Sequence, residues 1–114
     1  SDRNGAYNIS KAAEMALVRN IALEWGPHGV RANCLAPGLI RTDFSKALWS
    51  NADYHRAAVR ECPLQRIGEP DDIAAAALFL AGRGGGFTTG QTIVIDGGRM
   101  VGRVLDDHPA FAKS

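Results

Sequence analysis

Two short apolar segments, each placed after a helical pattern, constrain the fold of this chain most strongly. Residues 30–36 are mostly apolar, begin after a glycine and end before a Pro-Gly pair, which is typical of a buried strand. Residues 91–96 indicate a second strand and are followed by two glycines. A helix, a tight turn and an apolar strand in this order predict an α/β layer fold.

The helices are indicated by the spacing of apolar residues and by signals at their ends. Residues 6–25 have apolar side chains at helical spacing and stop at a Gly-Pro pair. Residues 70–81 begin with a proline and two aspartates, which suit the first turn, and a glycine follows. Residues 39–68 are expected to be irregular with one or two short helical stretches, and residues 83–90 to form a Gly-rich connection.

Two strands are too few for a complete sheet of this kind. Parallel strands need helices on both faces and several neighbouring strands. The chain also begins with Ser1 and not with a methionine. We therefore expect it to be the second part of a larger α/β domain.

Composition excludes several other classes of protein. Of the 114 residues, 46% are hydrophobic and 22% are charged, which is typical of a globular domain. The net charge of +1 gives no support for binding to nucleic acid or to an anionic membrane. The longest apolar stretch, residues 73–81, is far shorter than the roughly 20 residues that span a bilayer. The two cysteines are interpreted as reduced thiols, which fits a cytoplasmic location.

Tyr7 and Lys11 are the first candidates for chemistry. They are four residues apart at the start of the first predicted helix, so they share one face. A free phenol has a pKa of about 10, and an ammonium group nearby lowers the pKa by favouring the phenolate. The pair then suits general acid or base catalysis near neutral pH. Taken alone, the two residues also fit an ordinary helix with an incidental tyrosine and lysine.

Four segments together resemble, in order, motifs of the short-chain dehydrogenase/reductase family. They are Tyr-Asn-Ile-Ser-Lys-Ala-Ala at 7–13, Val-Arg-Ala-Asn-Cys-Leu-Ala-Pro-Gly-Leu-Ile-Arg-Thr at 30–42, Arg-Ile-Gly-Glu-Pro-Asp-Asp-Ile-Ala at 66–74, and Thr-Gly-Gln-Thr-Ile-Val-Ile-Asp-Gly-Gly at 89–98. Four ordered matches over nearly all of residues 5–98 are far more specific than one short motif. The resemblance implies the C-terminal portion of a Rossmann-like doubly wound parallel sheet, incomplete in this chain.

The resemblance implies an NAD- or NADP-dependent oxidoreductase that interconverts a carbonyl and a secondary alcohol. Tyr7 would be the catalytic acid/base and would exchange a proton with the substrate oxygen. Lys11 would lower the pKa of Tyr7 and hydrogen-bond the ribose of the nicotinamide nucleotide. The cofactor supplies the hydride, and the protein supplies orientation and proton transfer.

The family also implies a cofactor-binding role for the segment after the first strand. The turn of Pro37 and Gly38 would let the backbone approach the cofactor closely. Ile40 would contact the carboxamide through its backbone, and Thr42 would contact it through its hydroxyl. No spacing of histidine, cysteine or carboxylate residues suggests a metal site.

Phe44, Leu48 and Trp49 fall where the family has its variable substrate lid. They are expected either to wall a pocket for an apolar substrate or to pack against the body of the domain, and both interpretations stay open. The resemblance thus divides one NAD(P)-binding domain into an active-site helix, strand and nicotinamide loop (1–43), a substrate lid (44–68), a last helix and strand (69–98) and a tail (99–114).

The departures from the family lie in what the chain lacks. The Gly-rich dinucleotide fingerprint is absent from the sequence. The catalytic serine is also absent, because the family has it about a dozen residues before the tyrosine and Ser1 lies only six residues before Tyr7. The Gly-rich segment 82–87 follows a helix and precedes a strand, the reverse of the order that a phosphate loop requires. These absences favour the C-terminal part of a reductase subunit.

Partners and an alternative function follow from the same features. A homo-oligomer, dimer or tetramer, acting on a small carbonyl or alcohol substrate is implied by the resemblance. The alternative is a non-catalytic association module that lacks the dinucleotide-binding half. Such a module would expose a long sheet edge unless a partner covers it.

Overall fold

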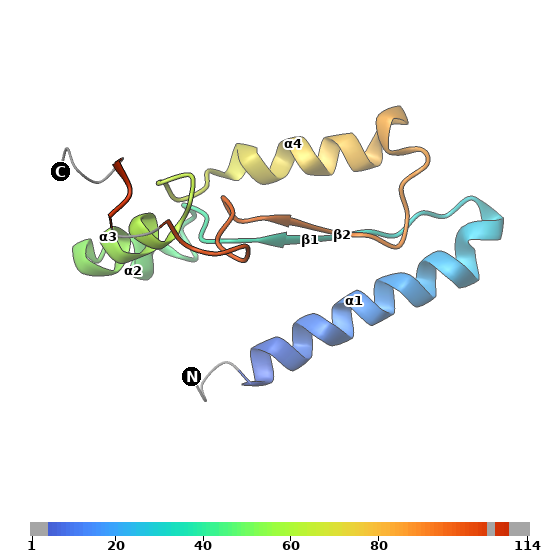
Figure 1. Ribbon diagram of the computed structural model, residues 1–114. Coiled ribbons are helices and arrows are strands. Elements are labelled where there is room, and N and C mark those ends of the chain that lie inside the picture. The colour runs from blue at the N-terminus through green and yellow to red at the C-terminus, as the bar shows by residue number, and fades with distance from the viewer. Residues whose placement is uncertain (1–4, 105–106, 110–114) are drawn as a thin grey trace. The chain divides into compact units, whose positions relative to one another are not determined.

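The computed structural model describes residues 5–104 and 107–109, and Figure 1 shows the order of the elements along the chain. These elements are α1 (Gly5–Trp25), β1 (Cys34–Pro37), α2 (Lys46–Trp49), α3 (Ala52–Glu61), α4 (Pro70–Ala81) and β2 (Thr92–Ile95), with 3-10 turns at Gly26–His28 and Arg83–Gly85. Both long predicted helices are confirmed, as are the short helices expected between them. None of the described helices is both long and apolar enough to cross a bilayer.

The two strands pair in parallel and form a two-stranded sheet, with α4 in the connection between them (Figure 1). The ladder begins where the Cys34 N–H donates to Gln91 O at 2.8 Å. It ends where the Gly38 N–H donates to Ile95 O at 2.9 Å. A strand, a crossover helix and a parallel strand are the unit from which doubly wound sheets are built. The predicted fold class is confirmed.

The strands are shorter and less buried than the sequence predicted. Residues 30–33 lie outside β1, because the Ala32 N–H donates to the Thr89 hydroxyl and side-chain bonds of Asn33 replace the ladder. Both strands are half-buried, with Pro37 and Val94 exposed. Parallel strands are fully buried only where helices cover both faces of the sheet.

The chain forms two compact units, and the boundary between them falls within both strands. The first contains the described residues up to Ala36 together with Ala74–Ile93, and the second contains Pro37–Ile73 and the described residues from Val94 onward. Each unit is built from segments that are far apart in the sequence.

In the first unit, polar side chains tie the segment before β1 to the region around the end of α4. Gly29 ends the turn after α1 in the left-handed conformation, with φ of 77°. The Arg31 Nη1 then donates to Leu80 O at 2.6 Å and to Gly85 O at 2.7 Å. The Asn33 side chain donates to Thr88 O at 3.0 Å. These bonds tie the segment before β1 to the end of α4 and to the connection that follows.

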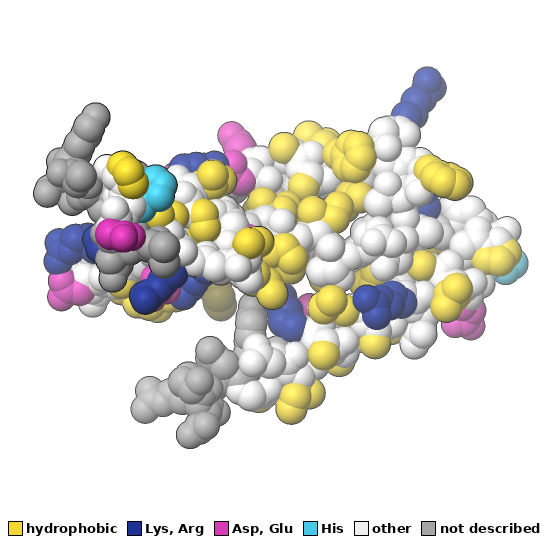
Figure 2. Space-filling model, in the orientation of Figure 1, with side chains coloured by type: hydrophobic (Ala, Val, Ile, Leu, Met, Phe, Trp, Pro, Cys, Tyr) yellow, Lys and Arg dark blue, Asp and Glu magenta, His cyan; other side chains and the backbone are white. Residues whose placement is uncertain are grey.

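Apolar side chains on α1 and α4 are exposed. Figure 2 shows hydrophobic side chains on the surface of both helices. The most exposed of these residues are Ile9, Leu17 and Leu23 on α1 and Leu78 and Phe79 on α4. Among the side chains of this unit that the structure describes, no hydrophobic one is buried. An apolar helix face of this size ordinarily packs against another element.

The second unit has a small core of its own. Ala58, Cys62 and Ile67 are its buried hydrophobic residues, each with less than a tenth of its surface exposed. The Asn51 side chain caps α3 by accepting a hydrogen bond from the Tyr54 N–H at 3.0 Å. The loop after β1 and the segment before α4 are joined at Ile40 and Gly68 by a parallel bridge.

Candidate active site

Tyr7 and Lys11 both lie near the start of α1, as predicted. Four residues separate them, so their backbone positions share one face of the helix. The Lys11 Nζ lies 3.5 Å from the Glu14 carboxylate, and about a third of the Lys11 side chain is exposed. The lysine therefore reaches solvent from a helix that holds its backbone in place.

Pro37 and Gly38 end β1 in the second unit, where the chain passes close to the end of β2. A side chain at Gly38 would place its Cβ 2.9 Å from both the Cα and the Cβ of Asp96. That distance is too short for a real contact, so only glycine fits here. Asp96 is itself held, because its two carboxylate oxygens accept hydrogen bonds from the N–H groups of Gly98 and Met100 at 2.9 Å. Gly38 therefore packs on Asp96, and the close approach of the Pro37-Gly38 backbone to a cofactor stays a prediction.

Ile40 lies in an extended segment with one side paired. The Gly68 N–H donates to Leu39 O, and the Arg41 N–H donates to Gly68 O, both at 2.8 Å. The N–H and C=O of Ile40 therefore point the other way. The Ile40 carbonyl accepts a hydrogen bond from the Ser45 hydroxyl at 2.5 Å. Within residues 5–104 and 107–109, nothing accepts a hydrogen bond from the Ile40 N–H.

Thr42 is hydrogen-bonded through its hydroxyl to Ser45 and through its carbonyl to Trp49. Its hydroxyl lies 3.0 Å from the Ser45 hydroxyl and accepts a hydrogen bond from the Ser45 N–H at 3.2 Å. Its carbonyl accepts a hydrogen bond from the Trp49 indole N–H at 2.9 Å. Ser45 and Trp49 thus fix the position of a residue assigned to the cofactor site.

Trp49 is also held from its other side. The Arg41 guanidinium lies over the indole, 5.0 Å from the ring centroid, and its Nε is 3.0 Å from the Glu69 carboxylate. A cation over an indole face is attracted by the ring quadrupole. These contacts join α2, the loop after β1 and the residue before α4.

The three residues predicted to wall a substrate pocket lie in different environments. Trp49 is half-buried against the loop, in line with the packing interpretation. Phe44 is fully exposed, and Leu48 is 45% exposed. Their role toward a substrate stays a prediction.

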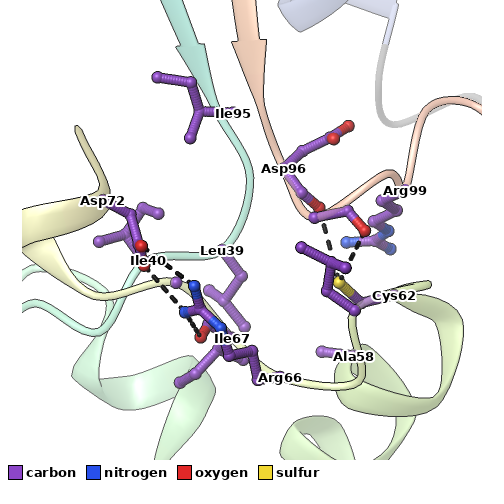
Figure 3. Close-up of a pocket in the computed structure, with 13 residues that line it drawn as sticks. Leu39, Ile40, Ala58, Cys62, Arg66, Ile67, Asp72, Ile95, Asp96 and Arg99 are labelled. Carbon is purple, nitrogen blue, oxygen red and sulfur yellow. Dashed lines mark hydrogen bonds and ion pairs between the residues drawn. The ribbon is translucent and has the colours of Figure 1, made fainter. Parts of the chain in front are cut away.

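A cavity of about 190 Å³ lies beside the loop, within the second unit (Figure 3). Leu39 and Ile40 form part of its wall, and the buried residues Ala58, Cys62 and Ile67 form another part. The lining is mainly apolar, with an ion pair at one end.

Arg66 and Asp72 form that ion pair, which Figure 3 shows as two parallel contacts. The distances are 2.8 and 3.0 Å, and Asp72 also accepts a hydrogen bond from the Glu69 N–H at 2.7 Å. The Arg66 hydrogen bonds and the backbone N–H lower the pKa of the Asp72 carboxyl to about 2. The same partner raises the pKa of Arg66. The sequence predicted only that Asp72 suits the first turn of the helix. The side chain also binds the Glu69 N–H and Arg66, both of which precede α4.

Several residues of the site escaped sequence reasoning. Ser45 lies in no quoted motif, and Arg41 and Arg66 lie within two of the family segments but were given no role. The partners of the two arginines become neighbours only in the folded chain. The one available signal was the hydroxyl three residues after Thr42, a spacing at which serine and threonine side chains bind nearby backbone groups. Among the described residues, no group of three or more candidate ligands could hold a metal ion.

Comparison with known proteins decides the family. Residues 1–99 match the family model described as enoyl-(acyl carrier protein) reductase. Dehydrogenase/reductase SDR family member 4 from Oryctolagus cuniculus is 42% identical over 94 residues, which cover 82% of this chain and 36% of that protein. The chain belongs to the short-chain dehydrogenase/reductase family. It spans about a third of the length of the curated relatives it matches.

Solved structures of short-chain dehydrogenases share the fold of this chain. A 4-hydroxyisoleucine dehydrogenase complexed with NADH is 34% identical with a TM-score of 0.81, over 86% of this chain and 40% of that one. A gluconate 5-dehydrogenase from Burkholderia cenocepacia, in complex with NADP and tartrate, is 33% identical with a TM-score of 0.79. That match covers 85% of this chain and 38% of the dehydrogenase. These likenesses confirm the Rossmann-like fold of the short-chain family.

Proposed function

We propose that the complete gene product carrying this chain is an NAD- or NADP-dependent oxidoreductase that interconverts a carbonyl and a secondary alcohol. The observation that carries the proposal is the loop after β1, in which a glycine packs on Asp96 and the Ile40 N–H has no acceptor among the described residues. Membership of the short-chain family supports it, and so do the NADH and NADP complexes of the similar dehydrogenases. The same relationship gives no support to a non-catalytic association module.

The residues of the loop fit a nicotinamide nucleotide. A carboxamide needs one donor for its oxygen and one acceptor for its amino group, and the Ile40 N–H and the Thr42 hydroxyl supply groups of these kinds. Pro37 and Gly38 would let the backbone at the start of the loop approach the nucleotide closely. Lys11 would bind the ribose. When bound, the nucleotide supplies or accepts the hydride.

Tyr7 would hold and move the proton at the substrate oxygen. Its place on α1, beside Lys11 on the same helix face, supports this role because a nearby ammonium favours the phenolate. Proton transfer from a positioned side chain accelerates a reaction by roughly 10²–10⁴-fold. The geometry of the helix alone sets the distance between the backbone positions of the two residues.

Phe44 and Leu48 would contact an apolar part of the substrate. Their exposure beside the cofactor loop supports this proposal, and Trp49 would hold α2 in place through its bond to Thr42. We further propose a homo-oligomer. The exposed apolar side chains of α1 and α4 support it, because a second copy would remove them from water. Light scattering of the purified protein measures that state.

The proposal is tested by carbonyl-dependent oxidation of NADH and NADPH, followed by nicotinamide absorbance with a panel of ketones. Tyr7→Phe removes the hydroxyl that would exchange the proton and is expected to lower turnover at least 100-fold with cofactor affinity unchanged. Tyr54→Phe, an exposed tyrosine on α3, is the matched control and should keep full turnover. Equal turnover in the Tyr7→Phe variant and the wild type would contradict the role given to Tyr7.

A further inference from the structure

The Ser45 hydroxyl has more neighbours than one hydroxyl can donate to. Its oxygen lies 2.5 Å from Ile40 O, 3.0 Å from the Thr42 hydroxyl, and 3.2 Å from both the N and the O of Thr42. A serine hydroxyl has one proton to donate and two lone pairs to accept with. The hydroxyl can donate to only one of the two carbonyls, those of Ile40 and Thr42, and it accepts from the Thr42 N–H, so the directions of the hydrogen bonds can be worked out.

The single Ser45 proton goes to the Ile40 carbonyl. That contact is the shortest of the four, and an O–H···O bond weakens as the distance grows. The Thr42 N–H can only donate, so it occupies one lone pair of the Ser45 oxygen. The second lone pair then accepts the proton of the Thr42 hydroxyl.

Thr42 is left with one free lone pair. Its hydroxyl proton is directed at Ser45, and one of its lone pairs accepts the Ser45 N–H at 3.2 Å. The remaining lone pair can only accept. The Ile40 N–H points to the same side as the Ile40 carbonyl, which Ser45 binds, because the opposite side of this segment pairs with Gly68.

We infer that Ser45 is a positioning residue that presents the Thr42 hydroxyl as a hydrogen-bond acceptor beside the Ile40 donor. A donor and an acceptor on one loop match the oxygen and the amino group of a carboxamide. The inference rests on the proposed function, in which this loop binds the nicotinamide. It adds that Ser45, which need not touch the cofactor, determines that the Thr42 hydroxyl accepts a hydrogen bond from the carboxamide and does not donate one.

A capping role does not account for Ser45. The residue precedes α2, where a serine side chain commonly accepts a hydrogen bond from the first turn of the helix. Its side chain makes no such bond and turns back toward the loop. The helix it precedes is only four residues long.

The test compares NADP, or NAD if the protein prefers it, with the 3-acetylpyridine analogue of the same nucleotide. The analogue keeps the carbonyl and replaces the amino group by a methyl group, so it loses only the bond to Thr42. Dissociation constants from calorimetry on the complete gene product give a ratio between the two nucleotides. For the wild type we expect about fivefold tighter binding of the carboxamide form, the value of one neutral hydrogen bond.

Ser45→Ala frees the Thr42 hydroxyl to rotate, and the fivefold preference is expected to fall to less than about twofold. Ser45→Thr restores the hydroxyl and should restore the preference. Ser50→Ala is the matched control, because the Ser50 hydroxyl also binds a carbonyl, that of Lys46, but does not contact the loop. Thr42→Val removes the acceptor itself and should lose the preference even if Ser45→Ala does not fold.

The failures are distinguishable. If the wild type binds neither NAD nor NADP, the proposed function is wrong and this inference is overturned with it. If the wild type binds one of them and folded Ser45→Ala or Thr42→Val keeps the full preference, only the inference is overturned. Loss of the preference in Ser50→Ala as well would also overturn it, since the effect would not be specific to Ser45.

Discussion

The two compact units maintain their structures in different ways. The second unit has buried apolar residues of its own and a dense set of side-chain hydrogen bonds around the loop after β1. The first unit has longer helices, but their apolar faces are exposed, and Arg31 ties the segment before β1 to the end of α4 and to the connection after it. Length and regularity of helices are therefore no measure of how much of its own stability a region supplies.

The comparison bears on function because the proton transfer proposed for Tyr7 and the cofactor binding proposed for the loop after β1 fall in different units. The pair proposed for proton transfer lies on a helix, where local spacing alone places the backbone positions of Tyr7 and Lys11 on one face. The loop after β1, which is proposed to bind the cofactor, has no regular structure, and its atoms are placed by contacts with residues distant in sequence, such as Asp96 and Glu69. We expect substitutions around the loop to alter cofactor binding and substitutions in α1 to alter chemistry.

Among the substitutions considered, the largest loss of stability is expected at Gly38. In Gly38→Ala the new methyl group would lie 2.9 Å from the Asp96 backbone, so the two strand ends must separate. We expect a loss of about 3 kcal/mol in the free energy of unfolding and no measurable cofactor binding. Gly26→Ala is the control, since nothing lies within 4 Å of its added atom. Denaturant unfolding measures both, and equal stabilities would contradict the close packing at Gly38.

In the first unit, we expect Arg31 to contribute to stability through its two hydrogen bonds to carbonyl groups. Arg31→Met keeps much of the apolar stem but leaves the carbonyls of Leu80 and Gly85 without their charged donor. We expect a loss of about 2 kcal/mol. Arg19→Met, on the exposed part of α1, should change stability by less than about 0.5 kcal/mol. If thermal unfolding shows the same loss for both variants, Arg31 does not hold the end of α4.

A smaller effect is expected at Trp49. Trp49→Phe keeps a ring beneath Arg41 but removes the N–H that binds Thr42 O. We expect the cofactor dissociation constant to rise about fivefold, as for the loss of one hydrogen bond, with turnover at saturating cofactor nearly unchanged. Trp25→Phe, at the end of α1, should leave the constant as it is. Lower turnover with an unchanged constant would place Trp49 at the substrate instead.

The smallest effect concerns pH. The pKa of Asp72 is lowered in the folded protein to about 2, so its ion pair with Arg66 stabilises the fold above the ordinary pKa of an aspartate, about 4, and is lost as pH falls from about 4 to about 2. Asp72→Asn should therefore be less stable than the wild type near neutral pH, and the difference should shrink over that interval. Asp71→Asn is the neighbouring control. A difference that is constant with pH would contradict the ion pair.

Sequence reasoning succeeded where the determinants are local. The Gly-Pro pair after residue 25 and Pro70 mark helix ends, and the spacing of Tyr7 and Lys11 depends only on helix geometry. It was less accurate where side chains compete with the backbone. Asn33 binds the connection before β2 and shortens the predicted first strand.

Apart from the three-residue spacing of Thr42 and Ser45, the contacts around the loop could not be predicted from the sequence. Trp49 becomes a neighbour of Thr42 only because α2 folds back on the loop, and Arg66 meets Asp72 only at the start of α4. Such pairs depend on the path of the chain between elements, which hydrophobic periodicity does not encode. The family resemblance assigned roles to Ile40 and Thr42, but not the groups that orient them.

The amide resonance of Ile40 tests the central claim most directly. In the gene product labelled with ¹⁵N-isoleucine, the Ile40 signal is assigned by its disappearance in Ile40→Val. If the loop binds the nicotinamide, this signal moves downfield on saturation with the preferred nucleotide, because its N–H gains a carbonyl acceptor, while the signal of Ile73 on α4 stays in place. An Ile40 signal that does not move at saturating nucleotide would contradict the assignment of this loop to the cofactor.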